Sequence, residues 1–197
     1  MKTPRGAKKL KAHRWKAEKY GHYVEERWVA ERLFDVETFD GLILDPCCGF
    51  GRIPIAAKAA GYDVIGRDLV HRGYGDPRDC ADFLDTDGRW PNIIANPPFH
   101  IIEEFTTHAL KIARRKVALI WLWQRLPAAT WLSDTPLARI YALNPRPSMP
   151  PGHVVKWYEK RGERPKGGTK DFCWLVFDHR YRGHPQTRWL KRDPDNE

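Results

Sequence analysis

The chain has 197 residues, of which 42% are apolar and 12% aromatic, and it carries a formal net charge of +9. This length suits one domain with a full hydrophobic core and is too short for two ordinary domains. No apolar run approaches the roughly 18 residues of a membrane span, and the basic N-terminus lacks the apolar core of a signal peptide. We therefore expect a soluble cytoplasmic protein without a membrane partner.

The basic charge is concentrated in the two flanks of the chain. Residues 1–19 carry a net charge of +7 and residues 152–192 another +7, whereas residues 20–151 carry −2 and residues 193–197 carry −3. Clustered basic charge binds phosphates independently of sequence, so a nucleic acid is the first partner to consider. The alternative is that the flanks only keep the protein soluble. The four cysteines lack the spacing of a zinc site, and we expect reduced thiols and no metal.

The predicted elements alternate between helices and short buried strands. In chain order they are a helix over 25–36, a strand over 42–44, a helix over 53–60, strands over 62–65, 79–85 and 92–95, a helix over 101–113, and strands over 117–123, 139–143 and 171–178. This order is typical of an α/β protein with an open, doubly wound, mostly parallel seven-stranded sheet. The last two strands, with no helix between them, are expected to pair antiparallel at one edge of the sheet.

These elements divide the chain into one domain with appendages. Residues 1–19 are predicted to form a basic arm, residues 20–192 a single domain with a basic insert at 144–170, and residues 193–197 an acidic tail. The insert contains five prolines and four glycines, and a connection of that length is usually functional or disordered.

A glycine-bearing loop, "LDPCCGFGR", follows the first predicted strand. Gly49 and Gly51 lie where this strand turns into a helix, which is where a backbone can approach a ligand closely. Asp68 follows Gly49 by 19 residues, about the spacing at which an acid reaches ribose hydroxyls in nucleoside-binding βαβ units. Ile53 and Pro54 stand where a third glycine would fall in a dinucleotide motif, so a cofactor with a ribose and no phosphate is favoured.

The strand over 92–95 ends abruptly in Asn96-Pro97-Pro98-Phe99. Proline cannot donate to a sheet ladder and restricts the residue before it, so the strand must stop at about Asn96. The tetrad then forms a rigid shelf with one carboxamide, one backbone carbonyl and one aromatic ring. The alternative is a strand-terminating turn with Phe99 in the core.

The two motifs together resemble class I S-adenosylmethionine-dependent methyltransferases. Asp45-Pro46-x-x-Gly49-x-Gly51 is similar to their cofactor loop, and the tetrad resembles the (Asn/Asp)-Pro-Pro-(Tyr/Phe) motif of members that methylate an amino nitrogen. The order of the motifs is that of N6-adenine DNA methyltransferases, and "RPSMPPG" with "DFCWLVFD" is similar to small prophage-encoded members.

The resemblance implies S-adenosylmethionine as the cofactor and a set of residues that bind it. The cofactor-binding positions carried over are Tyr23, Asp45, Pro46, Cys47, Gly49, Gly51, Asp68, Leu69, Asp82, Phe83 and Asn96. Structural alternatives remain for three of them: Asp68 as a helix cap, Asp82 as a loop acid beside a core Phe83, and Tyr23 as a packing residue.

The resemblance also implies how the shelf acts. An exocyclic amine is a poor nucleophile because its lone pair is delocalised into the ring. If the Asn96 side-chain oxygen and the Pro97 carbonyl each accept one N–H, the lone pair becomes available for in-line attack on the methyl group. Phe99 can stack on the base, which must be flipped out of a duplex or be unpaired already.

The substrate implied is adenine N6 in DNA, held by the basic insert. The candidate nucleic-acid-binding residues are Arg146, Lys156, Trp157, Tyr158, Lys160, Arg161, Arg164, Lys166 and Lys170. The alternatives are a base amine of RNA, of the guanine-N2 type, or a protein glutamine amide. An alternative of another class is a nucleic-acid-binding protein that has kept the fold without turnover. The sequence leaves the oligomeric state open.

Overall fold

The structure is a computed structural model that describes residues 21–163 and 168–193. In chain order its main helices and strands are α1 (Arg27–Val36), β1 (Ile43–Asp45), α2 (Arg52–Ala59), β2 (Val64–Gly66), β3 (Trp90–Ala95), α3 (Ile102–Ile112), β4 (Ala113–Leu122), β5 (Leu137–Asn144), α4 (Gly152–Glu159), β6 (Phe172–Asp178) and β7 (Gln186–Lys191). The predicted basic arm and nearly all of the acidic tail lie outside the described residues.

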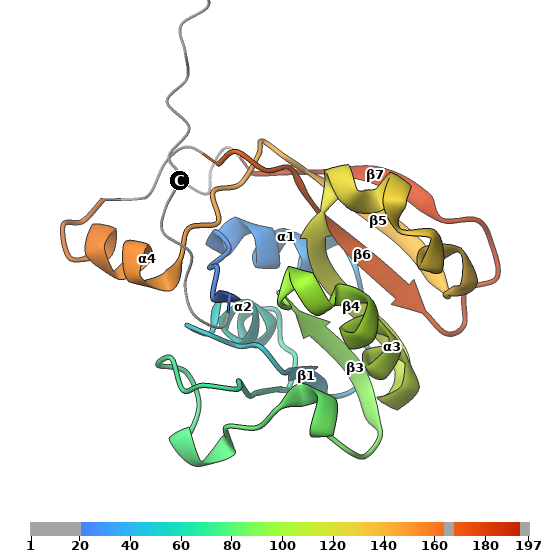
Figure 1. Cartoon of the computed structure of the whole chain (residues 1–197), viewed down its shortest axis with the longest axis horizontal. Coiled ribbons are helices and arrows are strands. Elements are labelled where there is room, and N and C mark those ends of the chain that lie inside the picture. The colour runs from blue at the N-terminus through green and yellow to red at the C-terminus, as the bar shows by residue number, and fades with distance from the viewer. Residues whose placement is uncertain (1–20, 164–167, 194–197) are drawn as a thin grey trace, which may run out of the picture.

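The strands form a single twisted sheet in the order β2-β1-β3-β4-β6-β5-β7 (Figure 1). The pairs β2–β1, β1–β3, β3–β4 and β5–β7 are parallel, whereas β6 is antiparallel to both β4 and β5. The expected α/β fold with a mostly parallel seven-stranded sheet is confirmed, including the antiparallel pairing of the last two predicted strands. The antiparallel strand, β6, lies between β4 and β5. The edge of the sheet on that side is therefore formed by β7.

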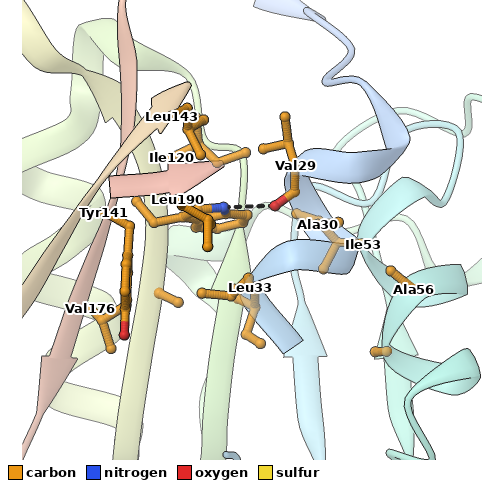
Figure 2. Packing of buried hydrophobic residues seen from close by; sticks show 14 of the residues in the cluster. Val29, Ala30, Leu33, Ile53, Ala56, Ile120, Tyr141, Leu143, Val176 and Leu190 are labelled. Carbon is orange, nitrogen blue, oxygen red and sulfur yellow. Dashed lines mark hydrogen bonds between the residues drawn. The ribbon is translucent and has the colours of Figure 1, made fainter. Parts of the chain in front are cut away.

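Two apolar layers cover the sheet, one on each face. Helices α1 and α2 pack on one face around Leu33, Ile53 and Trp174, and α3 packs on the other around Phe105 and Leu119. The indole N–H of the buried Trp174 donates to the carbonyl oxygen of Val29 at 2.9 Å, which ties β6 to α1 (Figure 2). Burial of such large side chains contributes about 1.5–3 kcal/mol each.

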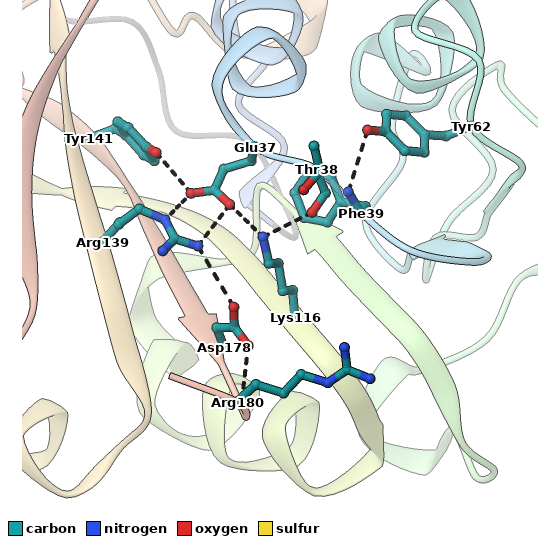
Figure 3. A network of polar contacts seen from close by, with 9 residues as sticks. All are labelled: Glu37, Thr38, Phe39, Tyr62, Lys116, Arg139, Tyr141, Asp178 and Arg180. Atoms are coloured by element: carbon teal, nitrogen blue, oxygen red, sulfur yellow. Dashed lines mark hydrogen bonds and ion pairs between the residues drawn. The ribbon is translucent and has the colours of Figure 1, made fainter. Parts of the chain in front are cut away.

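A buried ionic network closes the end of the sheet at which the parallel strands begin (Figure 3). Glu37 is 3% exposed and accepts hydrogen bonds from the Lys116 ammonium at 2.7 Å, the Tyr141 hydroxyl at 2.8 Å and the Arg139 guanidinium. Burial opposes the charged form of Glu37, but these donors outweigh burial and lower its pKa. The carboxylate is therefore fully compensated.

The strand expected over 79–85 does not form, and this prediction was wrong. The stretch, all of it described, begins at the last residue of one short 3-10 turn, η2 (Pro77–Asp79), and ends with another, η3 (Phe83–Asp85). The Asp82 side chain accepts the backbone N–H of Leu84 at 2.9 Å, and Asp76 accepts that of Arg78 in the same way. Such side-chain bonds to nearby backbone compete with a sheet ladder, and only Phe83 of the stretch has an apolar side chain in the core.

Two elements were not predicted. The insert between β5 and β6 contains α4, which begins directly after Pro151. The helix is eight residues long and buries only one apolar side chain, that of Val155, so the sequence shows no repeating apolar pattern there. At the sheet edge, β7 buries only Leu190, so no alternating pattern marks it in the sequence. The Arg32 guanidinium donates to the Lys191 carbonyl at 2.9 Å and ties β7 to α1.

Candidate functional site

The loop between β1 and α2 is a tight turn that only glycines permit. Gly49 has a φ of +51° and Gly51 a φ of +80°, in the left-handed region. A Cβ on Gly49 would lie 2.8 Å from Nε2 of His22, and a Cβ on Gly51 would lie 2.1 Å from the ring of Tyr74. Both glycines thus make room for protein side chains. The ring of Tyr74 fills the space next to Gly51, so this glycine does not face the cavity described below.

Asp68 holds this loop in place. Its Oδ2 accepts the backbone N–H of Gly49 at 2.9 Å, and its Oδ1 accepts that of Val70 at 3.2 Å. The guanidinium of Arg72 lies 3.8 Å from Oδ1. Each carboxylate oxygen has a further lone pair, so the side chain can still accept from a ligand hydroxyl. No helix begins at Asp68, so the alternative of a helix cap was wrong; the side chain braces the loop and lines the cavity.

Asp82 and Phe83 lie opposite that loop, at the start of η3. Asp82 caps the turn through its bond to Leu84 N, and Phe83 packs on Phe105 with ring centroids 4.3 Å apart. Phe83 is 5% exposed. Both side chains nevertheless line the cavity, so the core position of Phe83 and a place in the site are compatible.

The tetrad follows the end of β3, as predicted. The Asn96 Nδ2 donates one hydrogen bond to the Tyr23 carbonyl and another to Glu25 Oε2, both at 2.8 Å. No described residue donates to Asn96 Oδ1. Because both N–H groups are used, the carboxamide oxygen is the atom of this side chain left for a ligand.

Pro98 lines the cavity with Asn96, whereas Pro97 is buried and Phe99 faces away. The ring of Phe99 packs against Phe172 of β6 with centroids 6.0 Å apart and is half-buried. Phe99 thus packs against the core without being fully buried, and stacking on a base would require the ring to turn.

These segments enclose a cavity of about 560 Å³ at the carboxyl ends of β1, β2 and β3. That position is where open α/β sheets bind ligands. The predicted cofactor-binding residues that line it are Tyr23, Pro46, Cys47, Gly49, Asp68, Leu69, Asp82, Phe83 and Asn96. Asp45 and Gly51 do not line it.

Buried acids make this end of the sheet electrostatically unbalanced. Burial raises the pKa of Glu25, and it raises that of Asp45 well above its usual range, where the nearby Glu25 and Asp68 add to the effect. Asp45 is 1% exposed; its Oδ1 accepts from Cys47 N at 3.0 Å, and its Oδ2 is buried with no hydrogen-bond partner. Burial likewise raises the pKa of the Cys47 thiol, so it is not a reactive thiolate.

The sequence analysis missed several lining residues. They are Glu25, Phe50, Arg52, Arg72 and His100, with apolar Val24, Leu84, Ile101 and Phe105. Only the position of Glu25 two residues after Tyr23, in a segment already assigned to the cofactor site, could have drawn attention to it. Arg52 begins α2 and Phe105 lies in α3, where the helical pattern predicts packing and gives no sign of a cavity, and the others lie in loops or short 3-10 turns. Among the described residues, no cluster of three or more His, Cys, Asp or Glu side chains could hold a metal ion.

The insert packs beside the mouth of the cavity. The backbone N–H of Val24 donates to the Pro150 carbonyl at 2.9 Å, and Glu159 of α4 pairs with Arg52 at 2.7 Å. The Lys156 ammonium lies 5.0 Å from the centroid of the Phe50 ring. Helix α4 is thus held against the cofactor loop by polar and cation–π contacts.

Trp157 projects from α4 into solvent and is 50% exposed. The Arg161 guanidinium lies 3.8 Å from the centroid of its indole ring, and the Tyr158 ring meets it edge-on with centroids 4.8 Å apart. Lys160 and Lys170 are exposed, and Arg146 pairs with Asp171 at 2.7 Å. Arg164 and Lys166, also predicted to bind nucleic acid, lie outside the described residues.

No family profile matches the sequence, and no curated protein is similar to it. Solved structures of other proteins are similar to the structure of this chain. One is a candidate RNA methyltransferase from Pyrococcus horikoshii, with 18% identity over 77% of this chain and 81% of that chain and a TM-score of 0.52. Another is the magnesium protoporphyrin IX methyltransferase of Synechocystis with bound SAM, with 15% identity over 76% of each chain and a TM-score of 0.43. The first likeness shows a shared fold, the Rossmann-like architecture of class I methyltransferases. Within the described part of the chain, no helix has the length and apolar character needed to cross a bilayer.

Proposed function

We propose that this protein is an S-adenosylmethionine-dependent methyltransferase that acts on an exocyclic base amine, with adenine N6 in DNA as the favoured substrate. One observation carries the proposal. Both N–H groups of the Asn96 carboxamide are bound to protein acceptors, so its oxygen is left to accept a hydrogen bond at the edge of a cavity large enough for a nucleoside.

The residues of the cavity fit the cofactor. Asp68 retains acceptor capacity for ribose hydroxyls, and Phe83 and Leu69 offer apolar surface to an adenine ring. When bound, S-adenosylmethionine supplies a methyl group on a sulfonium centre. Its adenosine would lie between Asp68 and Phe83.

The chain's own part in the reaction is to hold and activate the amine. The Asn96 Oδ1 accepts one N–H of the amine, and the Pro97 carbonyl, whose direction the proline ring restricts, accepts the other. With both protons held, the nitrogen lone pair turns toward the methyl group. After transfer, the nitrogen releases one proton to solvent.

Nucleic acid is the proposed partner because of the surface around α4. Trp157 and Arg161 form an exposed aromatic and cationic platform on the helix that contacts the cofactor loop, and bases stack on such platforms at about 1–3 kcal/mol each. RNA is the second candidate, since the P. horikoshii neighbour is assigned to RNA. The remaining alternatives, a protein glutamine amide and a binding protein without turnover, lack an observation in their favour.

The decisive experiment is a transfer assay with labelled S-adenosylmethionine against duplex DNA, single-stranded DNA and structured RNA. Nucleoside mass spectrometry then identifies the product. We expect N6-methyladenine in DNA, and a loss of about 100-fold or more in Asn96→Ala, because one of two oxygen acceptors for the amine is removed. Label in RNA would move the proposal to the second substrate.

A matched pair of controls separates chemistry from folding. Asn96→Ala should bind S-adenosylmethionine within about threefold of the wild type, whereas Asp68→Ala should lose cofactor binding, because it removes the proposed ribose contact and the clamp on Gly49. Cofactor binding without transfer to any acceptor would favour the binding protein over the enzyme.

A further inference from the structure

Glu25 is a buried acid in contact with the proposed catalytic amide. It lies just before α1, is 8% exposed, and its Oε2 accepts the second N–H of Asn96 Nδ2 at 2.8 Å. Its neighbour Glu26 has the same chemistry but a different environment. Glu26 accepts the Ser148 backbone N–H and the Trp28 indole N–H and does not line the cavity.

The orientation of the Asn96 carboxamide depends on the acceptors around it. A carboxamide can rotate by a half turn at little intrinsic cost, because its oxygen and nitrogen have nearly the same shape. Two acceptors face Nδ2 here, the Tyr23 carbonyl and the Glu25 carboxylate. A flipped amide would place Oδ1 against both of them and turn two donors toward the cavity. A charged acceptor opposes this flip about twice as strongly as a neutral one.

We infer that Glu25 is the positioning residue of the site: its carboxylate holds the Asn96 oxygen toward the acceptor amine and requires an amide, not a carboxylate, at position 96. The inference rests on the proposed function and adds to it. Glu25 acts through Asn96 and touches no reacting atom, so it is not itself a catalytic residue.

The requirement for an amide follows from the charges around Glu25. Its titratable neighbours are Asp45 at the end of β1 and Arg52 of α2; Asp68 and His22 line the same cavity. Only Arg52 among the groups that act on Glu25 is cationic. An aspartate at position 96 would bring a second carboxylate within 2.8 Å of the first in a buried place, and two such groups do not both ionise.

The test is a set of variants at positions 25 and 96 with Glu26→Gln as the control. Glu25→Ala removes the charged acceptor, and we expect kcat to fall about 10- to 100-fold with the affinity for S-adenosylmethionine within about threefold. Glu25→Gln keeps an oxygen acceptor and should recover most of that loss. Glu26→Gln should behave as the wild type. If Glu25→Ala matched Glu26→Gln, the inference would be overturned.

A charge swap gives the sharper test. Asn96→Asp should be at least 100-fold slower than the wild type and should gain activity as the pH is lowered, because one proton shared with Glu25 relieves the repulsion. In the double variant Glu25→Gln, Asn96→Asp, the glutamine amide can donate to the aspartate. We expect it to be at least tenfold faster than Asn96→Asp at neutral pH and less dependent on pH. A double variant no better than Asn96→Asp would contradict the inference.

A spectroscopic measurement keeps this test independent of turnover. The two Asn96 Nδ2 protons, assigned by loss of their signals in Asn96→Ala, should exchange slowly with solvent in the wild type and in Glu26→Gln, and faster in Glu25→Ala. If no methyl transfer occurs in any protein but this pattern holds, the proposed function fails and the positioning of Asn96 stands. Equal exchange in all the proteins would reject the positioning itself.

Discussion

The two ends of the sheet bury acids in opposite ways. Where the parallel strands begin, Glu37 is surrounded by Lys116, Arg139 and Tyr141, and its pKa is lowered. Where they end, Glu25 and Asp45 are as deeply buried, and their pKa values are raised. The difference is the supply of donors: Glu37 has three side-chain partners, whereas Asp45 Oδ2 has none.

This contrast separates stability from function within one core. A buried charge with matched partners holds the surrounding elements together, and a buried charge without them destabilises the fold and persists where a site requires it. The Glu37 network joins the end of α1 to β4 and β5. We therefore expect substitutions at that end to change stability first, and substitutions at the cavity to change activity first.

The largest effect should follow Glu37→Ala. The variant leaves Lys116 and Arg139, whose side chains are 16% and 17% exposed, without their buried counter-charge. Breaking one side of such a network costs about 3–5 kcal/mol. The free energy of unfolding, measured by denaturant titration, should fall by that amount, while Glu31→Ala in α1, the helix that Glu37 follows, should change it little. A loss below about 1 kcal/mol would show that the network does not stabilise the fold.

A smaller loss should follow Tyr141→Phe. The substitution removes one hydrogen bond to a charged acceptor and leaves both cations in place, so we expect a loss of about 1.5 kcal/mol. Burial, together with the same hydrogen bond, raises the pKa of Tyr141 to about 12. In an alkaline titration followed by tyrosine absorbance, the wild type should therefore show one late-ionising hydroxyl that is missing from the curve of Tyr141→Phe. Unchanged titration curves would mean that the hydroxyl is not buried against Glu37.

The smallest effect, and one of opposite sign, should follow Asp45→Asn. A pKa raised in the folded state means that the folded protein holds a proton that the unfolded chain releases from pH 3.8 upward. Stability from this group is therefore present in acid and lost as the pH rises through the folded-state pKa. Asp45→Asn keeps an acceptor for Cys47 N and removes that loss. We expect a gain of about 1 kcal/mol at pH 8 and none near pH 4. A variant less stable than the wild type at pH 8 would contradict the comparison.

The parts of the fold that the sequence predicted are those with strong local signals. The buried run before Asn96 and the proline pair after it define the end of β3, because no other structure suits that combination. The glycine loop after β1 was found for a similar reason, since its backbone requires residues without a side chain.

The wrong or incomplete predictions concern residues that suit more than one structure, because the sequence does not show which contacts their side chains make. Asp82 bonds to nearby backbone and replaces the expected strand with a turn, although its residues suit either structure. Gly51 makes room for Tyr74, which lies 23 positions along the chain, so a ligand-binding role could not be distinguished from packing. Glu25 depends on Asn96, 71 positions away, and no local pattern marks such a pair.

The placement of the insert has a consequence for how this domain can diversify. Strands β5 and β6 are antiparallel neighbours, with Ala142 opposite Cys173, so the two ends of the segment that contains α4 emerge side by side from a completed ladder. Closing a flexible loop between fixed ends costs only about 0.6 kcal/mol for each doubling of its length. The length of this segment can therefore vary at little cost while the sheet beneath it stays the same.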